Sequence, residues 1–257
     1  MEILLVNTSL RPNSIIKMFP VGIGYVASAI KNAGYKFDLL DHEAWRPLPE
    51  EGIAYIKRKK YTVVALASLP SGYKMVKALC QLIRDLQPQS TIIVGNTVAS
   101  SIPEILLKKT AADIAVLGEG DITIVELLHA LEMKGSIKDI PGIAFKYYAS
   151  QKDKRENKHS IIEHRYRPPI KDLDTLPWID FRSFDTEIYI DNSREQISRP
   201  FPTGLTEENI RMLPINTARG CVYNCSFCYH AFKGMPYRTR SPQSVMDEAD
   251  YLVKKYN

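Results

Sequence analysis

The sequence has no apolar run long enough to cross a membrane, and this absence excludes a helical membrane protein. The longest apolar stretches, TVVALASL and STIIVGNTVA, fall far short of the roughly 20 residues that a spanning helix requires. The first residues, MEILLVN, lack the basic segment, the longer apolar segment and the cleavage site of an export signal. We therefore expect a cytoplasmic protein without a membrane span.

A strong excess of charge of one sign is also absent, because 34 Lys and Arg residues accompany 29 Asp and Glu residues. The resulting net charge of +5 is mild, and the basic cluster KRKK at 57–60 is typical of a solvated helix end. Charge therefore indicates no nucleic-acid partner. Hydrophobic residues make up 45% of the chain, which is ordinary for a globular protein with a substantial core.

Five short apolar segments alternate with five segments of helical periodicity over residues 1–135. The expected strands are EILLVN, YKFDLLD, YTVVALAS, STIIVG and ADIAVLG, and each is followed by an amphipathic stretch such as GIGYVASAIKNAG. Nearly continuous apolar strands separated by helices are typical of a parallel sheet covered on both faces. The pattern predicts an α/β domain with a doubly wound five-stranded parallel sheet.

The loops after these strands lack the usual nucleotide-binding fingerprints. Neither G-x-G-x-x-G after the first strand nor G-x-x-x-x-G-K-[ST] is present. The loops are nevertheless rich in glycine and small polar residues, and ligands of such sheets bind beyond the carboxyl ends of the strands. Either another flat or bulky ligand binds there, or the glycines only form tight turns.

A different pattern begins after residue 135. The segments IPGIAFKYY and SIIEHRYR predict a β-hairpin, and PPIKDLDTLPWIDFRSFD predicts an extended segment packed between domains. A strand at 213–218 is then followed by a loop and a helix at 241–256, which Ser241 caps and Pro242 opens. We predict a ligand-binding domain at 1–135, a connector at 136–212 and a further domain beginning at 213–257.

Cysteine is scarce, yet three of the four cysteines lie within eight residues, at Cys221, Cys225 and Cys228. A single disulfide would leave one thiol over and is disfavoured in the cytosol. Zinc requires four ligands in a structural site, and His230 could complete a set of three cysteines and one histidine. An iron-sulfur cube held by three thiolates would keep one iron open to another ligand. The aromatic Phe227, directly before the last cysteine, favours the cluster, and zinc remains the alternative.

The spacing Cys-x-x-x-Cys-x-x-aromatic-Cys, introduced by NTARGC, resembles the signature of radical S-adenosylmethionine (SAM) enzymes. The N-terminal part is similar to their cobalamin-binding subgroup, which includes radical methyltransferases and the anaerobic magnesium-protoporphyrin ester cyclase. The segments that carry this resemblance are FPVGIGYVASAIKNAGYKFDLLD, VLGEGD, IPGIAF and DLDTLPWIDF. The resemblance implies that residues 213–257 form the first βα unit of a radical SAM partial TIM barrel.

The resemblance also implies the chemistry of the cysteines. Cys221, Cys225 and Cys228 would hold a 4Fe-4S cluster whose open iron binds SAM and cleaves it reductively, with methyl transfer or cyclisation as the outcome. Such an enzyme works under anaerobic conditions and takes its electron from a donor such as flavodoxin or ferredoxin. Phe227 and Tyr229 would pack near the cluster or the adenine of SAM.

A cobalamin site in the N-terminal domain is implied as well, with the nucleotide tail threaded into the α/β sheet. Its expected contacts are Ser68, Leu69, Gly95, Asn96, Gly118, Glu119 and Gly120. Many relatives have Gly-Gly-x-His where this chain has GNTV, so Asn96 takes the place of a glycine. The Asp-x-His-x-x-Gly motif is absent, so no protein histidine is expected on cobalt, and His42 is expected at the surface.

Two other functions remain open at this point. A radical SAM methylthiotransferase would need a second cysteine trio in the N-terminal domain, where the chain has only Cys80. A non-enzymatic cobalamin-binding or zinc-binding module needs no further residues. Only 29 residues follow Cys228, whereas a barrel needs several further βα units to close around its cofactor. We therefore expect the chain to be a fragment of a longer enzyme whose substrate the sequence does not identify.

Overall fold

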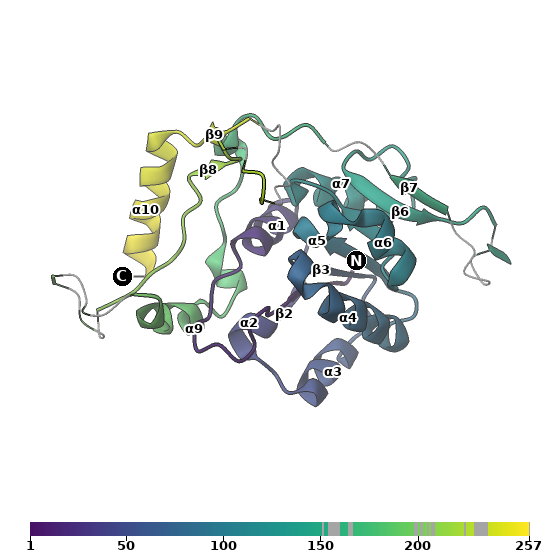
Figure 1. The fold of residues 1–257 in the computed structure, drawn as a ribbon, viewed down its shortest axis with the longest axis horizontal. Coiled ribbons are helices and arrows are strands. Elements are labelled where there is room, and N and C mark those ends of the chain that lie inside the picture. The colour runs from purple at the N-terminus through teal and green to yellow at the C-terminus, as the bar shows by residue number, and fades with distance from the viewer. Residues whose placement is uncertain are drawn as a thin grey trace.

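The structure is a computed structural model of residues 1–257, dominated by one seven-stranded sheet. It describes the whole chain except residues 151, 154–159, 164–166, 198–199, 201–202, 205, 207–208, 224, 229–235 and 257. Figure 1 shows the sheet enclosed by helices, with the C-terminal helix α10 at one end of the molecule and the strands β6 and β7 at the other. The predicted α/β class is confirmed.

The first five strands are parallel, as the alternation of apolar and helical segments predicts. They are β1 (Ile3–Asn7), β2 (Asp38–Asp41), β3 (Val63–Ala67), β4 (Thr91–Gly95) and β5 (Ile114–Val116), in the spatial order β2-β1-β3-β4-β5. Asn7 pairs with both Asp41 and Ala67, and Ala67 pairs with Gly95, so these strands end level with one another. The loops that follow them therefore meet at one edge of the sheet.

Alternate residues of each strand enter two separate apolar cores. In β1, Leu4 and Val6 face one core, whereas Ile3 and Leu5 face the other. The helices α3 (Pro49–Lys57), α4 (Tyr73–Leu86), α5 (Asn96–Ser101) and α6 (Pro103–Lys109) cover the first face. The helices α1 (Val21–Asn32) and α7 (Gly120–Glu132) cover the second face. This two-period alternation explains why the strands read as continuous apolar runs.

The predicted hairpin is present, and it extends the sheet. Strands β6 (Ile143–Tyr147) and β7 (Ser160–Glu163) pair with each other in antiparallel fashion, and β6 also pairs antiparallel with β5. Gly142 lies in the turn directly before β6, and its φ of 79° places it in the left-handed region that glycine tolerates. The hairpin is therefore structurally continuous with the parallel strands.

Residues 168–185, predicted as an extended segment, are irregular apart from the short helical turns η2 (Leu173–Thr175) and η3 (Phe181–Ser183). The helices α9 (Thr186–Asp191) and η4 (Ser193–Gln196) follow. Asp172 and Asp180 cap the N-termini of η2 and η3, which explains why aspartate is frequent here. The buried ring of Phe181 lies 4.7 Å from that of Phe19, so this segment packs against the start of α1.

The cysteine segment contains one small ribbon and one helix. Strands β8 (Ala218–Arg219) and β9 (Arg238–Thr239) pair in antiparallel fashion, and α10 (Pro242–Tyr256) follows. The Ser241 hydroxyl accepts the Ser244 amide at 3.1 Å, which confirms the predicted cap. The predicted strand at 213–218 is wrong except for its last residue, Ala218, which belongs to β8 and pairs with β9. Residues 213–217 have no strand beside them among the described residues.

The sheet has one further helix at its edge, α2 (His42–Trp45), which the sequence pattern did not predict. The Asp41 carboxylate caps α2 by accepting the amides of Glu43 and Ala44. In the residues that the structure describes, no helix has the length and apolar character needed to span a bilayer.

Candidate functional site

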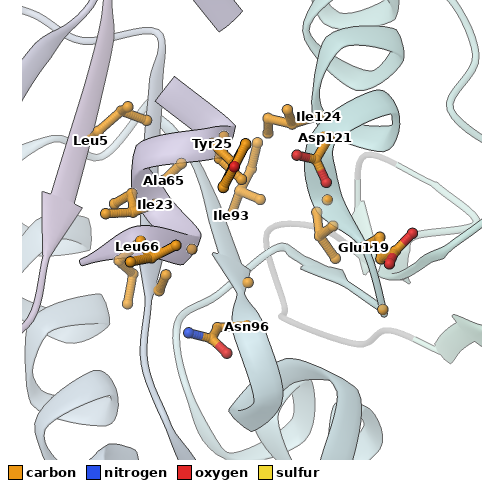
Figure 2. Close-up of a pocket in the computed structure, with 18 of the residues that line it drawn as sticks. Leu5, Ile23, Tyr25, Ala65, Leu66, Ile93, Asn96, Glu119, Asp121 and Ile124 are labelled. Carbon is orange, nitrogen blue, oxygen red and sulfur yellow. The ribbon is translucent and has the colours of Figure 1, made fainter. Parts of the chain in front are cut away.

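A cavity of about 260 Å³ lies between the sheet and the two helices α1 and α7. Its floor is formed by strand residues such as Leu5, Ala65 and Ile93, which belong to the apolar core on this face. Figure 2 shows Tyr25 of α1 and Asp121 of α7 on two sides of the pocket, with Ile93 of the sheet between them. An apolar cavity with a few polar groups at its rim is typical of a ligand site.

The loop residues predicted to bind cobalamin converge on this cavity. Gly95 and Asn96 follow β4, Gly118, Glu119 and Gly120 follow β5, and all five line it. Ser68 and Leu69 follow β3 and line an adjacent cavity of about 390 Å³, which also borders Asn96. The two cavities share Val21, Gly22, Ile23 and Ala67 in addition to Asn96. The residues at the carboxyl ends of β3, β4 and β5 thus surround two adjoining cavities, here together called the cleft, at this edge of the sheet.

The backbone at Asn96 explains why this residue can replace a glycine. Its φ is 67°, in the left-handed region that glycine adopts freely and that asparagine tolerates better than other residues. The side-chain oxygen of Asn96 accepts the Thr97 amide at 2.6 Å, which starts α5. The side chain of Asn96 is exposed and lines both cavities, and its amide nitrogen would lie 3.9 Å from a Cβ atom on Gly22 of α1.

Gly120 has a direct effect on the size of the cavity. A Cβ atom at this position would lie 3.5 Å from the Val26 side chain and 3.6 Å from the Val116 side chain. Glycine therefore leaves space between the wall formed by α1 and the floor formed by β5.

Glu119 has a structural environment that the sequence did not indicate. Its carboxylate receives two hydrogen bonds from the Arg238 guanidinium, at 2.7 and 3.1 Å, and one from the Ile170 amide at 2.9 Å. The side chain of Glu119 is 8% exposed, and that of Arg238 is 7% exposed. The predicted cofactor residue Glu119 thus lines the cavity while holding β9 against the sheet edge.

A second pair lies beside the first one. The Arg219 guanidinium donates to both oxygens of Asp121, at 2.7 and 3.0 Å, and its carbon lies 5.0 Å from the centre of the Tyr25 ring. Burial disfavours the charged guanidinium, but the hydrogen bond and the charge of Asp121 outweigh this effect and raise the pKa of Arg219. Arg219 also lines the cavity.

Sequence reasoning missed Arg219, Arg238, Asp121 and Tyr25 as members of the site. A signal existed for two of them, because Arg219 lies in the cysteine signature NTARGC and Asp121 ends the loop GEGD. Tyr25 lies in a segment that carries the family resemblance, but its contact with Arg219 is not a local feature, and Arg238 carries no motif. The Arg219–Asp121 and Arg238–Glu119 pairs join residues 98 and 119 positions apart, which no local pattern specifies.

The three cysteines begin two residues after Arg219 and are all exposed free thiols. Gly220, with a φ of 98°, turns the chain between Arg219 and Cys221, and a Cβ there would lie 2.7 Å from the Pro236 carbonyl oxygen. The Cys221 sulfur accepts the Tyr223 amide at 3.5 Å, and the Cys228 amide donates to the Cys225 carbonyl at 3.2 Å. Among the described residues, no three His, Cys, Asp or Glu side chains converge as a metal site.

The donor set nevertheless suits an iron-sulfur cluster. Exposed thiols are accessible to iron, and a backbone amide that donates to a cysteine sulfur is a contact that tunes such clusters. Phe227 is 90% exposed and has no buried surroundings. Tyr229 and the alternative ligand His230 lie outside the described residues.

Cys80 differs from the other three cysteines. It is fully buried in the core beneath α4, and burial raises the pKa of its thiol to about 12. A thiol in this state is a poor metal ligand because the ligand is the thiolate. Cys80 is therefore a core residue, which removes the basis for a second cluster in the N-terminal domain.

His42 is half-buried rather than a surface residue, so that expectation is wrong. It starts α2, and its Nε2 atom is buried without a hydrogen-bond partner. Burial lowers the pKa of the imidazole, although the nearby Asp41 carboxylate opposes this shift. The position of His42 beyond β2 is explained by the Asp41 cap, and it does not line the cavity.

Comparisons with known proteins agree with this geometry. Residues 16–128 match the family described as B12 binding domain. The chain is 26% identical over 249 residues to the anaerobic magnesium-protoporphyrin IX monomethyl ester cyclase of Rubrivivax gelatinosus, covering 93% of this chain and 40% of that protein. It is 25% identical over 268 residues to the cytidylyl-2-hydroxyethylphosphonate methyltransferase of Streptomyces wedmorensis, covering 93% and 49%.

A solved structure shares the fold. The radical SAM methyltransferase TsrM from Kitasatospora setae, solved with cobalamin and a [4Fe-4S] cluster bound, superposes with a TM-score of 0.68 at 17% identity. The match covers 99% of this chain and 46% of that one. The chain thus spans less than half the length of these relatives, and the family resemblance noted in the sequence is confirmed.

Proposed function

We propose a function from the premise that this chain carries a B12-binding domain and is homologous to cobalamin-binding radical SAM enzymes. The chain would hold cobalamin in the cleft at the carboxyl edge of the sheet and a 4Fe-4S cluster on its three clustered cysteines. When bound, these groups would supply reductive cleavage of SAM and transfer of a methyl group or ring closure. The names of the relatives include both a cyclase and methyltransferases.

One observation carries this proposal. Arg219 lines the same cavity as Gly95, Gly118 and Gly120, and Cys221 follows it by two residues. The cofactor cleft and the thiols thus lie at the same edge of the sheet. An enzyme that brings a cobalt centre and a cluster together would require this adjacency.

The roles of the residues follow from their surroundings. The apolar walls, which include Leu5, Ile23 and Ile93, would exclude water from the nucleotide tail, and Gly120 would leave it room. The loops at Gly95 and Gly118 would bring backbone close to the ligand without side-chain obstruction. Cys221, Cys225 and Cys228 would supply three thiolates, and an electron donor such as flavodoxin or ferredoxin would reach them at the exposed loop.

Anaerobic reconstitution tests this proposal. The purified chain is incubated with ferrous iron and sulfide, its iron and zinc contents are measured, and hydroxocobalamin is then titrated by absorbance. We expect one cobalamin and one cluster of four irons per chain. Zinc without iron would favour the zinc module, and iron without cobalamin would leave a radical SAM protein that does not use the cleft.

A further inference from the structure

We propose that Arg219 is a positioning residue that couples the cavity to the cysteine loop through its ion pair with Asp121. This inference rests on the proposed function, because it concerns how a ligand in the cleft and a metal group on the thiols affect one another. The four residues Glu119, Asp121, Arg219 and Arg238, here named the junction cluster, form the connection. Neither arginine belongs to the two apolar cores of the sheet.

The geometry of the ribbon aims both arginines at one target. Arg219 of β8 pairs directly with Arg238 of β9, and directly opposed residues of an antiparallel pair point to the same face. The two carboxylates are two positions apart, because Glu119 directly precedes α7 and Asp121 is its second residue. Each arginine takes one carboxylate in a two-bond arrangement, and a weaker contact of 3.9 Å joins Arg219 to Glu119.

Burial makes this cluster sensitive to loss of a partner. The exposed fractions of the Arg219 and Asp121 side chains are 13% and 5%. A charge left alone at such a site keeps the penalty of desolvation without the compensating attraction. The ion pair therefore fixes the position of the Arg219 guanidinium relative to Asp121.

Within the described residues, the short route along the chain from the cavity wall to the thiols begins at Arg219 of the junction cluster. Asp121 and Arg219 both line the cavity, and Gly220 alone separates Arg219 from Cys221. Gly220 is packed so closely against Pro236 and Tyr237 that a Cβ atom would not fit. A shift of Arg219 is thus transmitted to Cys221 rather than absorbed by the intervening residue.

A coupling of this kind must be reciprocal. If a ligand in the cleft fixes the Asp121 loop, it also fixes Arg219 and the start of the cysteine loop, and a cluster on the thiols has the same effect in reverse. The affinity for cobalamin should therefore be higher in the iron-loaded chain than in the iron-free chain. We expect a ratio of roughly fivefold or more, which is the lower end of typical coupling between sites.

Titration of hydroxocobalamin into iron-free and iron-loaded protein measures this ratio. In the Arg219→Gln variant we expect the ratio to fall to about one, while the iron content stays at the wild-type level. Asp121→Asn removes the same pair from the other side and should give the same loss. Because the two residues act through one contact, the double variant should show no further loss.

A matched control separates coupling from a general effect on α7. Arg167 forms an ion pair with Glu126 of α7 and donates to Thr123 at 3.0 Å, but it lines neither cavity. Arg167→Gln should leave the affinity ratio unchanged. Thermal unfolding of each variant is recorded in the same samples, and Arg219→Lys serves as the milder change if Arg219→Gln unfolds.

The outcomes distinguish the two proposals. A wild-type chain that binds neither cobalamin nor iron overturns the proposed function. A wild-type chain that binds both, with an affinity ratio of one or with a ratio that survives Arg219→Gln and Asp121→Asn, overturns the coupling alone. A reduced ratio in the Arg167→Gln control would also overturn it, because the effect would then belong to α7 as a whole.

Discussion

The parallel sheet and the cysteine segment are held in place by different forces. The sheet buries two large apolar cores on its two faces, whereas the cysteine segment at 213–257 shares one small core with Tyr25, Ile179 and Phe181. It brings to this core the buried Leu252 and the partly buried Leu213, Ile215 and Tyr256. Its attachment also includes the buried ion pairs of Arg219 and Arg238. Apolar packing gives the cleft its shape without a ligand, while the ion pairs orient a loop whose thiols still lie exposed.

The largest difference between the regions should appear when thiols are removed. Replacing Cys221, Cys225 and Cys228 together with alanine should abolish iron binding, because the sequence has no other group of three cysteines that could supply the thiolates. Cys80→Ala should retain iron, since this thiol is buried in the core. Iron analysis after reconstitution checks both. Iron retained by the triple variant would show that another set of residues holds it.

The two regions should also differ in their response to large-to-small substitutions. Leu4→Ala in the sheet should lower the free energy of unfolding by about 4 kcal/mol, because a fully buried side chain leaves a cavity that rigid neighbours cannot fill. Leu252→Ala in α10 should cost about 2 kcal/mol, since its small core can relax around the gap. Urea unfolding measures both. Equal losses would mean that the cysteine segment is packed as rigidly as the sheet.

Filling the cleft should separate its function from that of the thiols. Gly120→Leu places a side chain between Val26 and Val116 and should weaken cobalamin binding on the order of 100-fold, as expected for a filled apolar pocket. Iron binding should remain, because the cysteine loop does not depend on this space. Gly135→Leu, beyond the end of α7 and away from the cavity, is the matched control. Unchanged cobalamin affinity in Gly120→Leu would place the ligand elsewhere.

The smallest expected effect concerns pH and the contact between α1 and η3. Burial opposes ionisation of Asp180, but hydrogen bonds from Arg182 and Lys31 outweigh it and lower the pKa of this carboxyl from 3.8 to about 2. A depressed pKa stabilises the folded chain above pH 4, and this contribution is lost as the pH falls from about 4 toward 2. The difference in urea midpoint between wild type and Asp180→Asn should therefore shrink over that interval. A constant difference would contradict the assignment.

Most of the sheet was predictable because strand identity depends on local patterns. Continuous apolar runs such as ILLVN at 3–7 are typical of strands buried on both faces, and all five predicted strands are present in parallel. The prediction of a strand at 213–218 is wrong because its apolar residues pack against the small core that contains Phe181. Among the described residues, no strand lies beside 213–217 to pair with them. Pairing partners are a tertiary property that the local sequence does not carry.

The candidate site likewise has parts that follow from local sequence patterns and parts that depend on tertiary contacts. The loops at Gly95, Asn96 and Gly118–Gly120 could be predicted, because parallel strands bring their carboxyl ends to one edge. The junction cluster could not be, since Arg219 and Asp121 are 98 residues apart and meet only once the ribbon lies on that edge. Among the described residues, the three cysteine sulfurs do not converge as a metal site, so their role as cluster ligands stays a prediction.

The most direct test of the account is the electron paramagnetic resonance spectrum of the reduced, iron-loaded chain before and after SAM is added. Three thiolates leave one iron of the cluster open, so we predict that SAM changes the g values of the signal. A spectrum that SAM leaves unchanged, or a chain that takes up zinc and no iron, would contradict the account.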